Sequence, residues 1–321
     1  MAVYTSISKD ALEDHLAAFD IGRLVSFEPV AEGVENSNYF IKTDRDKYVL
    51  TLFEKRVVPE ELPFYLGFME YVRSHGIPAP RVLAARQGGS VLSLKGKPSI
   101  ITEFLKGNWP RRITPSHAAA VGEKLAQMHA LGRKFPMKRA NTMSYPAWKS
   151  LIHACRDGAD RLESGLFAFL DAELEDIGKN WPKYLPRGAI HADLFPDNVF
   201  FDSDKIFGII DFYFACSDTL AYDLMLTFNA WCFDKDSGLD QDRARVFLEA
   251  YQKTRPLTRG ELKSLPFFGR ASALRIVATR LYDLLNPVAD AIVTPKDPME
   301  YIRILRFHRQ IRALADYGFR L

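Results

Sequence analysis

Cysteine is scarce in this sequence, and neither sign of charge dominates. The 321 residues include three cysteines, Cys155, Cys216 and Cys232, which form no CxxC pair and no zinc-ligand spacing. So sparse and odd a set argues against a disulfide framework and is typical of proteins kept in a reducing cytosol. Lysine and arginine number 43 against 40 aspartates and glutamates. This balance lacks the basic excess of a nucleic-acid-binding surface, so we expect no nucleic acid as a partner.

Long apolar runs are also missing. No stretch of ~18 apolar residues occurs, so we expect no transmembrane helix and no membrane partner. The first ten residues lack the basic and apolar regions of a signal peptide. With 47% hydrophobic and 26% charged residues, the chain has the composition of an ordinary globular protein. We therefore expect a cytoplasmic location.

The first hundred residues favour a β-rich lobe. Short runs rich in β-branched and aromatic residues, separated by polar turns, are typical of antiparallel strands. These runs are Leu24–Ala31, Asn38–Thr43, Tyr48–Phe53, Ser90–Leu94 and Pro98–Phe104. Between the third and fourth runs, Pro59–His75 has the apolar spacing of a helix and stops at a glycine.

After Gly107 the apolar period becomes that of helices, and only Gly188–Asp211 interrupts it with short apolar runs. Three helix starts carry capping signals: Thr114 with a following proline, a capping box at Thr258–Glu261, and the same kind of start at Asp297–Glu300. We therefore predict an α+β fold of two lobes, residues 1–105 and 106–321, joined by a hinge.

One motif carries most of the chemical information. His191, Asp193 and Asn198 form an HxDxxxxN pattern, and Asp211 follows at the end of an apolar run. Amide and carboxylate oxygens are the ligands that magnesium prefers, and one or two from the protein suffice when phosphate and water supply the others. Asn198 and Asp211 can supply such oxygens, which leaves Asp193 to accept a proton from an alcohol. This arrangement suits phosphoryl transfer.

Two segments of the β-rich lobe are candidates for nucleotide contact. Glu32–Tyr39 is a polar turn with one glycine, Gly33, whose backbone N–H groups can cradle phosphate oxygens. A plain hairpin has the same pattern. Ser99–Gly107 leaves the lobe as a strand whose free backbone groups can pair with a purine edge, and an ordinary strand end is the alternative.

These segments together resemble the kinase-like phosphotransferases that include aminoglycoside and choline kinases. The segment 191–198 is similar to their catalytic loop, Ile209–Asp211 to their metal-binding strand end, and Glu103–Leu105 to their adenine hinge. Residues 218–224 resemble the segment that follows. The resemblance covers essentially the whole chain. It implies a bilobal protein-kinase-like fold, with a small antiparallel N-terminal lobe that has one main helix and a larger, mainly helical C-terminal lobe.

The resemblance also implies roles for individual residues, with ATP and magnesium as cofactors. Asp193 would be the base, Asn198 and Asp211 would hold magnesium, and His191 would support the loop. Six residues of the N-terminal lobe would contact the nucleotide: Gly33, Ser37, Asn38, Thr51, Glu103 and Leu105. Thr51 stands where the fold usually has a phosphate-binding lysine, so that Lys42, Lys47, Lys55 or Arg56 would have to substitute.

Within this group the sequence resembles the homoserine kinase branch most. The shared segments are AEGVENSNYF at 31–40, YVLTLFE at 48–54, HADLFPDN at 191–198 and DFYF at 211–214. The resemblance implies ATP-dependent phosphorylation of L-homoserine to O-phospho-L-homoserine, on the way to threonine. It leaves the oligomeric state open.

A homoserine site requires a guanidinium group for the carboxylate and a carboxylate for the ammonium. Arg270, Arg275 and Arg280 lie on one predicted helix, and we favour Arg280 together with Asp218. Other acceptors remain open, namely choline, ethanolamine, an aminoglycoside or methylthioribose. A nucleotide-binding pseudokinase scaffold and a magnesium-dependent phosphohydrolase are further alternatives, although the base and both metal ligands are present.

Overall fold

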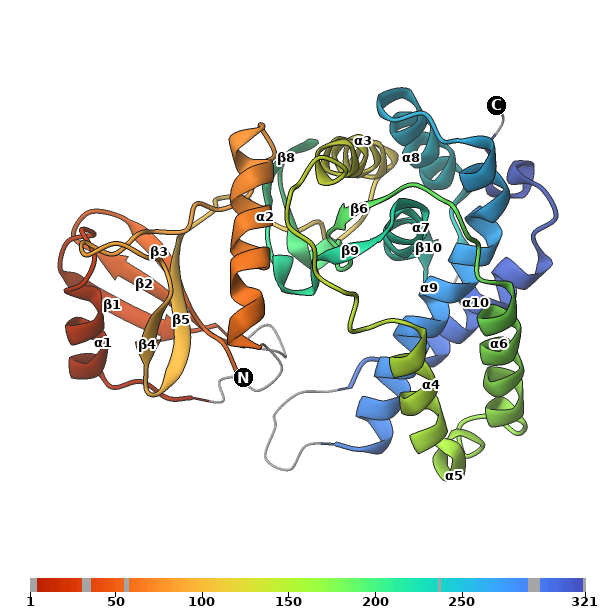
Figure 1. Ribbon diagram of the computed structural model, residues 1–321, viewed down its shortest axis with the longest axis horizontal. Coiled ribbons are helices and arrows are strands. Elements are labelled where there is room, and N and C mark those ends of the chain that lie inside the picture. Colours follow the sequence, from red (N-terminus) through yellow and green to blue (C-terminus); the bar gives the residue numbers. More distant parts are fainter. Residues whose placement is uncertain (1–4, 31–35, 55–57, 236–237, 288–294, 320–321) are drawn as a thin grey trace. The chain divides into compact units, whose positions relative to one another are not determined.

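The computed structural model (Figure 1) describes residues 5–30, 36–54, 58–235, 238–287 and 295–319. Contacts between these residues divide the chain into two compact units. Residues up to 106 form unit 1, and residues from 107 onward form unit 2. Unit 1 is built on a sheet and unit 2 mainly on helices. The predicted α+β class is therefore confirmed.

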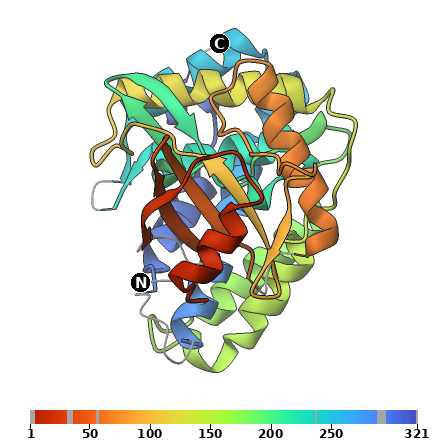
Figure 2. The same ribbon diagram turned by 90° about the vertical axis from the view of Figure 1, so that its left-hand side faces the viewer.

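Unit 1 contains an antiparallel five-stranded sheet with the strand order β1-β2-β3-β5-β4. The strands are β1 (Leu24–Pro29), β2 (Ser37–Thr43), β3 (Lys47–Leu52), β4 (Leu92–Leu94) and β5 (Lys97–Glu103). Because side chains alternate between the two faces of a sheet, Tyr39, Leu50 and Ile101 share the face that packs against α1 (Lys9–Leu16). Figures 1 and 2 show α1 lying against this sheet.

All five predicted strands are confirmed, and their ends differ from the predicted ones by one or two residues. The predicted helix is a 3-10 turn, η1 (Pro59–Glu61), followed by α2 (Leu62–Ser74). The expectation of one main helix omitted α1. Its local signal is Ser8, whose hydroxyl accepts a hydrogen bond from the backbone N–H of Ala11 and so caps the helix.

Helix α7 of unit 2 is buried along nearly its whole length, and α3, α8 and α9 pack against it. The helices of unit 2 are α3 (Pro115–Gly132), α4 (Tyr145–Ala154), α5 (Arg156–Ala159), α6 (Leu166–Asn180), α7 (Leu220–Trp231), α8 (Gln241–Thr254), α9 (Arg259–Leu285) and α10 (Met299–Gln310). Figure 1 shows α9 between α7 and α10, and α3 beside α8. A Cβ on Gly122 of α3 would lie 2.3 Å from the carbonyl oxygen of Phe247, so glycine is needed for this close approach.

Two short antiparallel pairs position the motif of unit 2. Strand β6 (Arg187–Ile190) pairs with β9 (Cys216–Thr219), and β7 (Val199–Asp202) pairs with β8 (Lys205–Ile209). A third pair joins β10 (Phe233–Asp234) to β11 (Gly238–Leu239). The loop that carries His191, Asp193 and Asn198 therefore connects β6 to β7.

The capping predictions have two outcomes. Thr114 caps α3, and Thr258 forms a capping box with Glu261 at the start of α9, as predicted. The predicted box at Asp297 is wrong. Asp297 accepts a hydrogen bond from Met299 N, but Glu300 turns away to pair with the Arg280 guanidinium at 2.7 Å. An ion pair with α9 has replaced the local bond.

The three cysteines are buried free thiols. Within the described ranges, no helix has the length and apolar character required to cross a bilayer.

Candidate functional site

The loop that follows β6 is fixed through its backbone by one buried carboxylate. Asp223 on α7 accepts hydrogen bonds from the backbone N–H groups of His191 (3.1 Å) and Ala192 (2.9 Å). Ala192 has a φ of +61°, a left-handed conformation that costs a non-glycine residue roughly 1–2 kcal/mol. The two bonds hold the loop in this conformation, and Asp193 follows directly.

The His191 imidazole connects this loop to the strand end that carries Asp211. Its Nε2 lies 3.1 Å from the carbonyl oxygen of Ile210, and its Nδ1 lies 3.2 Å from the backbone N of Asp193. Since Nδ1 must accept from that N–H, the proton of the neutral ring is on Nε2 and is donated to Ile210. Burial lowers the pKa of His191 to about 4. His191 is therefore a neutral structural bridge, as expected for a residue that supports the loop.

Asn198 lies beside the carboxylate of Asp193. Its Nδ2 donates to the backbone carbonyl of Asp193 (2.8 Å) and to the carboxylate Oδ2 (3.1 Å). A 3-10 turn, η2 (Pro196–Asn198), brings the amide back to the aspartate. With Nδ2 used in this way, Oδ1 is the Asn198 atom left for a cation.

Arg275 of α9 contacts the same loop from a buried position. Its Nη1 donates to the carbonyl of Ala192 (2.9 Å), and its Nη2 lies 3.8 Å from Oδ1 of Asp193. The guanidinium lies over the ring of Phe214, 5.4 Å from its centroid. Arg275 is only 3% exposed, so it places a fixed positive charge beside the carboxylate.

Asp211 lies at the end of the β7–β8 hairpin next to Asn198. The backbone N–H of Ile210 donates to the carbonyl of Asn198 (3.0 Å). Asp211 itself has a φ of +64°, and non-glycine residues in this region cluster at functional sites. Asp193, Asn198 and Asp211 are thus brought together at one end of the hairpin.

This donor set fits magnesium bound together with phosphate. In the part of the chain that the structure describes, no group of three or more His, Cys, Asp or Glu side chains is arranged to hold a metal ion. One carboxylate and one amide oxygen, from Asp211 and Asn198, are nevertheless a typical protein share for magnesium that keeps phosphate and water ligands.

In unit 1, Asn38 and Thr51 form a pair on neighbouring strands. The Thr51 hydroxyl donates to Oδ1 of Asn38 at 2.8 Å, and the two residues are direct partners in the β2–β3 ladder. The Thr51 hydroxyl is therefore held by the side chain of Asn38 on the neighbouring strand. Gly33, Lys55 and Arg56 lie outside the described residues.

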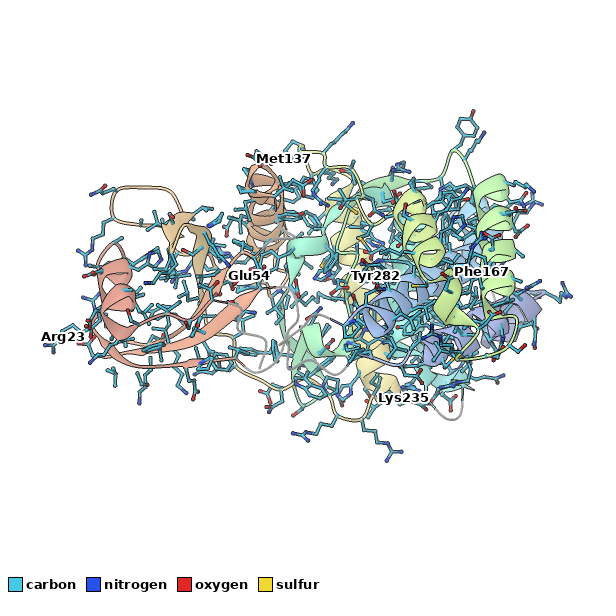
Figure 3. All side chains as sticks on the ribbon, turned by 90° about the horizontal axis from the view of Figure 1, so that it is seen from below. Arg23, Glu54, Met137, Phe167, Lys235 and Tyr282 are labelled. Atoms are coloured by element: carbon cyan, nitrogen blue, oxygen red, sulfur yellow. The ribbon has the colours of Figure 1, made fainter. Side chains whose placement is uncertain are left out.

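Ser37 belongs to a different cluster, on the other face of the strand. Its hydroxyl donates to Oε1 of Glu54 (2.6 Å), and Glu54 also forms an ion pair with Lys97. Figure 3 labels Glu54 within unit 1. Burial raises the pKa of Glu54, but the bonds from Lys97, Ser37 and Thr5 outweigh this effect and lower it overall. Lys97 is thus held in an ion pair at the start of β5.

The end of β5 has most of its backbone N–H groups in use. Glu103 N donates to Arg81 O (3.0 Å) and Phe104 N to Lys47 O (3.3 Å). No hydrogen bond from the N–H of Leu105 to another described residue is present. Phe104 packs edge-on against Phe40 of β2. Leu105 is therefore the residue at this strand end whose N–H can pair with a ligand.

The residues favoured for the acceptor are engaged with protein partners. Nη1 of Arg280 donates to Glu300 (2.7 Å) and to the Asp297 carbonyl (3.0 Å). The buried Asp218 accepts from Asn141 Nδ2 (2.8 Å) and pairs with Arg187 (3.1 Å). Of the three arginines named on α9, Arg275 contacts Asp193, and Arg270 pairs with Glu173 and Asp176.

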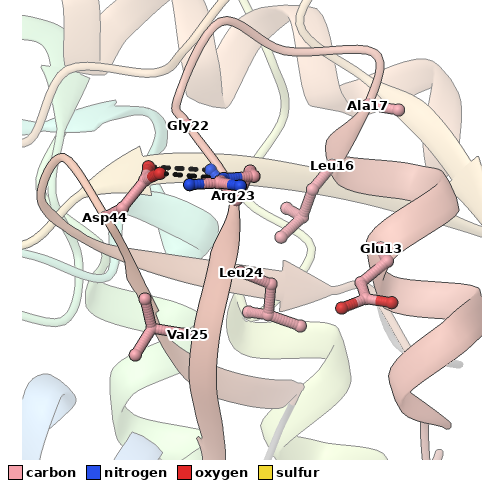
Figure 4. Close-up of a pocket in the computed structure, with 8 residues that line it drawn as sticks. All are labelled: Glu13, Leu16, Ala17, Gly22, Arg23, Leu24, Val25 and Asp44. Carbon is pink, nitrogen blue, oxygen red and sulfur yellow. Dashed lines mark hydrogen bonds and ion pairs between the residues drawn. The ribbon is translucent and has the colours of Figure 1, made fainter.

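A pocket of about 580 Å³ lies in unit 1 between α1 and the start of β1. Figure 4 shows Arg23 on its wall, bonded to Asp44. Its lining residues are Glu13, Leu16, Ala17, Gly22, Arg23, Leu24, Val25 and Asp44. None of the predicted site residues is among them, so we assign it no part in the chemistry.

Sequence reasoning missed Asp223 and Arg275 as residues that hold the loop. The sequence places Asp223 only within the segment 218–224, and Arg275 only among three arginines of the helix that is α9. A local signal exists for Asp223, because a carboxylate in an otherwise apolar helix must find buried partners. No local signal distinguishes Arg275 from its neighbours on α9.

The buried histidines predict a loss of stability in acid. Burial lowers the pKa of His191 to about 4 and that of His308 to about 3, from 6.5. Between these pKa values and pH 6.5, the two histidines bind protons in the unfolded chain but not in the folded chain. The free energy of unfolding should therefore fall below pH 6.5, by about 1.4 kcal/mol per pH unit for each histidine. Urea unfolding at pH 7 and pH 5 measures this fall.

The variant His308→Gln tests the origin of the effect. It removes one titrating group, so its stability should depend on pH less steeply than that of the wild type, whatever its stability at pH 7. Equal stability of the wild-type protein at pH 7 and pH 5 would contradict the assignment.

Comparisons with known proteins show which family this chain resembles. The phosphotransferase enzyme family matches residues 26–257. The chain is 48% identical over 318 residues to the homoserine kinase of Bradyrhizobium sp. (strain ORS 278), covering 99% of this chain and 98% of the relative. It is 48% identical over 324 residues to that of Paramagnetospirillum magneticum, covering 99% of each.

Among solved structures, an amicoumacin kinase in complex with AMP-PNP and Ca²⁺ has a TM-score of 0.71 at 14% identity, covering 97% of this chain and 94% of that one. This likeness shows the fold, and the expected kinase-like fold is confirmed. The full-length relatives and the family match go further: this chain belongs to the phosphotransferase enzyme family and, within it, to the homoserine kinases.

Proposed function

We propose that this protein transfers the γ-phosphoryl group of ATP to the side-chain hydroxyl of L-homoserine, giving O-phospho-L-homoserine and ADP. The observation that carries the proposal is the 48% identity, over the full length, to relatives named homoserine kinase. The environment of Asp193 supports it, because the loop, the adjacent amide and the arginine hold this carboxylate in one orientation.

In the proposed reaction the homoserine oxygen forms a bond to the γ-phosphorus of ATP, and the bond between this phosphorus and the oxygen that leaves with ADP breaks. Asp193 orients the hydroxyl and accepts its proton. The adjacent positive charge of Arg275, 3.8 Å from Oδ1, attracts this carboxylate and helps to hold it in place. Phosphoryl transfer depends mainly on alignment and on charge near the phosphate, so the rigidity of the loop matters more than a strong base.

Asn198 and Asp211 would hold magnesium in this reaction. When bound, the ion neutralises charge on the phosphate oxygens. The protein holds the two ligands in place. The hydrogen bond from Asn198 to Asp193 links the amide to the proposed base, and the β7–β8 hairpin places Asp211 next to Asn198.

We propose unit 1 as the nucleotide-binding lobe and unit 2 as the catalytic and acceptor-binding lobe. Gly33, Ser37, Asn38 and Thr51 would face the phosphates, and Glu103 with Leu105 would receive the adenine. The N–H of Leu105, which donates to no other described residue, supports the adenine assignment. Ser37 is the least supported, because Glu54 already binds its hydroxyl.

For the acceptor, Asp218 is proposed to bind the ammonium group and Arg280 the carboxylate. Both would have to share their present partners, since Arg280 pairs with Glu300 and Asp218 with Arg187. Arg275 is the alternative guanidinium, because it already lies beside Asp193.

An ADP-release assay with homoserine, choline, methylthioribose and an aminoglycoside tests the function. We expect kcat/KM for homoserine to exceed the others by at least ~100-fold, since a site with polar groups for an amino acid rejects molecules that leave these groups unpaired. Preference for another acceptor would refute the substrate. If none of the four acceptors led to ADP release, the kinase assignment would be refuted.

The metal role of Asp211 gives a separate prediction. Magnesium should raise the affinity for ATP at least ~10-fold less in Asp211→Ala than in the wild type, because the substitution removes the charged metal ligand. Titration of ATP with and without magnesium measures the effect. Asp202→Ala, at the exposed far end of strand β7 of the same hairpin, is the matched control. Equal magnesium dependence in the Asp211 variant and the wild type would exclude the role.

A further inference from the structure

A continuous chain of buried polar side chains runs from the Asp193 loop to the start of α9. Oδ2 of Asp223 lies 3.0 Å from Nε2 of His129 on α3, and Nδ1 of His129 lies 2.7 Å from the Tyr251 hydroxyl on α8. The Arg255 guanidinium then donates to this hydroxyl (2.9 Å) and to Oε1 of Glu261 (2.8 Å). The last carboxylate is the one that closes the capping box of α9.

The hydrogen bonds of this chain have a single consistent direction. The ionised Asp223 carboxylate can only accept, so the neutral His129 ring carries its proton on Nε2 and donates it to Asp223. Nδ1 of His129 then accepts from the Tyr251 O–H, and the Tyr251 oxygen accepts from Arg255. Burial lowers the pKa of His129, which keeps the ring neutral. Burial raises the pKa of Asp223, but its bonds from His129 and the loop lower it overall, so the carboxylate is ionised.

Both ends of this hydrogen-bonded chain act on the same residue of the loop, Ala192. At one end, Asp223 accepts from the N–H of Ala192. At the other end, the chain fixes the first turn of α9, and this helix carries Arg275, which donates to the carbonyl of Ala192. The strained residue before Asp193 is therefore held on both sides by elements that His129 and Tyr251 join.

We propose that His129 and Tyr251 are positioning residues for the phosphoryl transfer. They fix the charge and orientation of Asp223, and through it the direction in which Asp193 presents its carboxylate. The proposal deepens the proposed function and rests on it for its kinetic test. It assigns a role to two side chains of α3 and α8 that belong to none of the predicted motifs.

Unit 2 contains a matched control for this role. His308 of α10 has its Nδ1 2.7 Å from the Tyr317 hydroxyl and its Nε2 2.7 Å from Oδ1 of Asn229. Tyr251 and Tyr317 are both fully buried at 0% exposure. The second pair has the same hydrogen bond in the same unit, and among the described residues no hydrogen bond links it to the loop that carries Asp193. Tyr251→Phe and Tyr317→Phe therefore each remove a buried hydroxyl that bonds a histidine. Of these two hydroxyls, only that of Tyr251 is connected through described residues to the Asp193 loop.

The test compares kcat of the two variants per folded protein. Tyr251→Phe should lower kcat about 10-fold, while KM for ATP and for homoserine stays within about 2-fold of wild type. Tyr317→Phe should keep the wild-type kcat even where it lowers the melting temperature. Equal kcat in the two variants, whether reduced or not, would overturn the proposal, since a merely structural role affects both alike.

A second pair of variants keeps the test valid if Tyr251→Phe does not fold. His129→Gln retains a donor near the position of Nε2, whereas His129→Leu removes it. We expect His129→Gln to retain the higher kcat, and equal values would contradict the positioning role.

Hydrogen exchange tests the connection without any substrate. The amide of Ala192 should exchange faster in Tyr251→Phe than in Tyr317→Phe or wild type, because the Asp223 carboxylate loses its orientation. If the wild type does not phosphorylate homoserine, the proposed function fails. The exchange measurement then tests by itself whether Tyr251 acts on Ala192 through His129 and Asp223. Unchanged exchange at Ala192 in Tyr251→Phe would overturn it.

Discussion

Replacing Asp193 with alanine should lower kcat for phosphoryl transfer by at least ~100-fold and leave ATP bound with near wild-type affinity. This is the expectation for loss of a general base, which typically contributes 10²–10⁴-fold. The ATP affinity should persist because the proposed nucleotide contacts lie in unit 1 and the proposed metal ligands, Asn198 and Asp211, remain.

The size of the effect follows from the contacts of this carboxylate. Asn198 binds its Oδ2 at 3.1 Å, and Arg275 lies 3.8 Å from its Oδ1. Alanine removes the atom that receives the proton and leaves the positive charge of Arg275 without this carboxylate beside it. A guanidinium has no acceptor atom for a proton, so Arg275 does not replace the missing base.

The same loop contains the control. Asp197 lies four residues further on and is exposed, with a 3.4 Å ion pair to Lys296. Asp197→Ala removes a carboxylate from the same segment and should keep kcat within about 3-fold, since exposed ion pairs contribute little. Single-turnover transfer and ATP titration measure both variants. A kcat for Asp193→Ala near that of Asp197→Ala would refute the base assignment.

The sequence predicted the features that depend on neighbours along the chain. The strands of unit 1 follow from short runs of β-branched and aromatic residues between polar turns, and the starts of α3 and α9 follow from Thr114 and Thr258. The HxDxxxxN motif identified Asp193 and Asn198 because one short turn brings them together. The cytoplasmic location stays a prediction.

The contacts that hold the loop could not be predicted in this way. Asp223 binds His129, 94 positions away, and Arg275 binds Ala192, 83 positions away. Only tertiary packing defines such pairs. Helix α9 also buries side chains around most of its circumference, so its apolar period does not show which arginine faces the loop. The apolar period of α9 therefore gives no ground to prefer Arg275 over Arg280.

Asp223→Ala should lower the free energy of unfolding by about 3–5 kcal/mol. The carboxylate is fully buried, and its removal leaves Nε2–H of His129 and the N–H groups of His191 and Ala192 without acceptors. Each buried donor that loses its partner costs about 1–3 kcal/mol, so three such donors account for a loss of this size.

A second histidine–aspartate pair in unit 2 separates burial from pairing. Nε2 of His153 lies 2.9 Å from Oδ1 of Asp171, and both side chains are more than a third exposed. Asp171→Ala breaks a bond of the same kind, but water can replace it, so the loss should stay below about 1 kcal/mol. Urea unfolding of both variants at pH 7 compares them. Equal losses would show that Asp223 contributes no more than a surface pair. A loss of several kcal/mol confined to Asp223→Ala would show that the fold depends on the same carboxylate that orients the Asp193 loop.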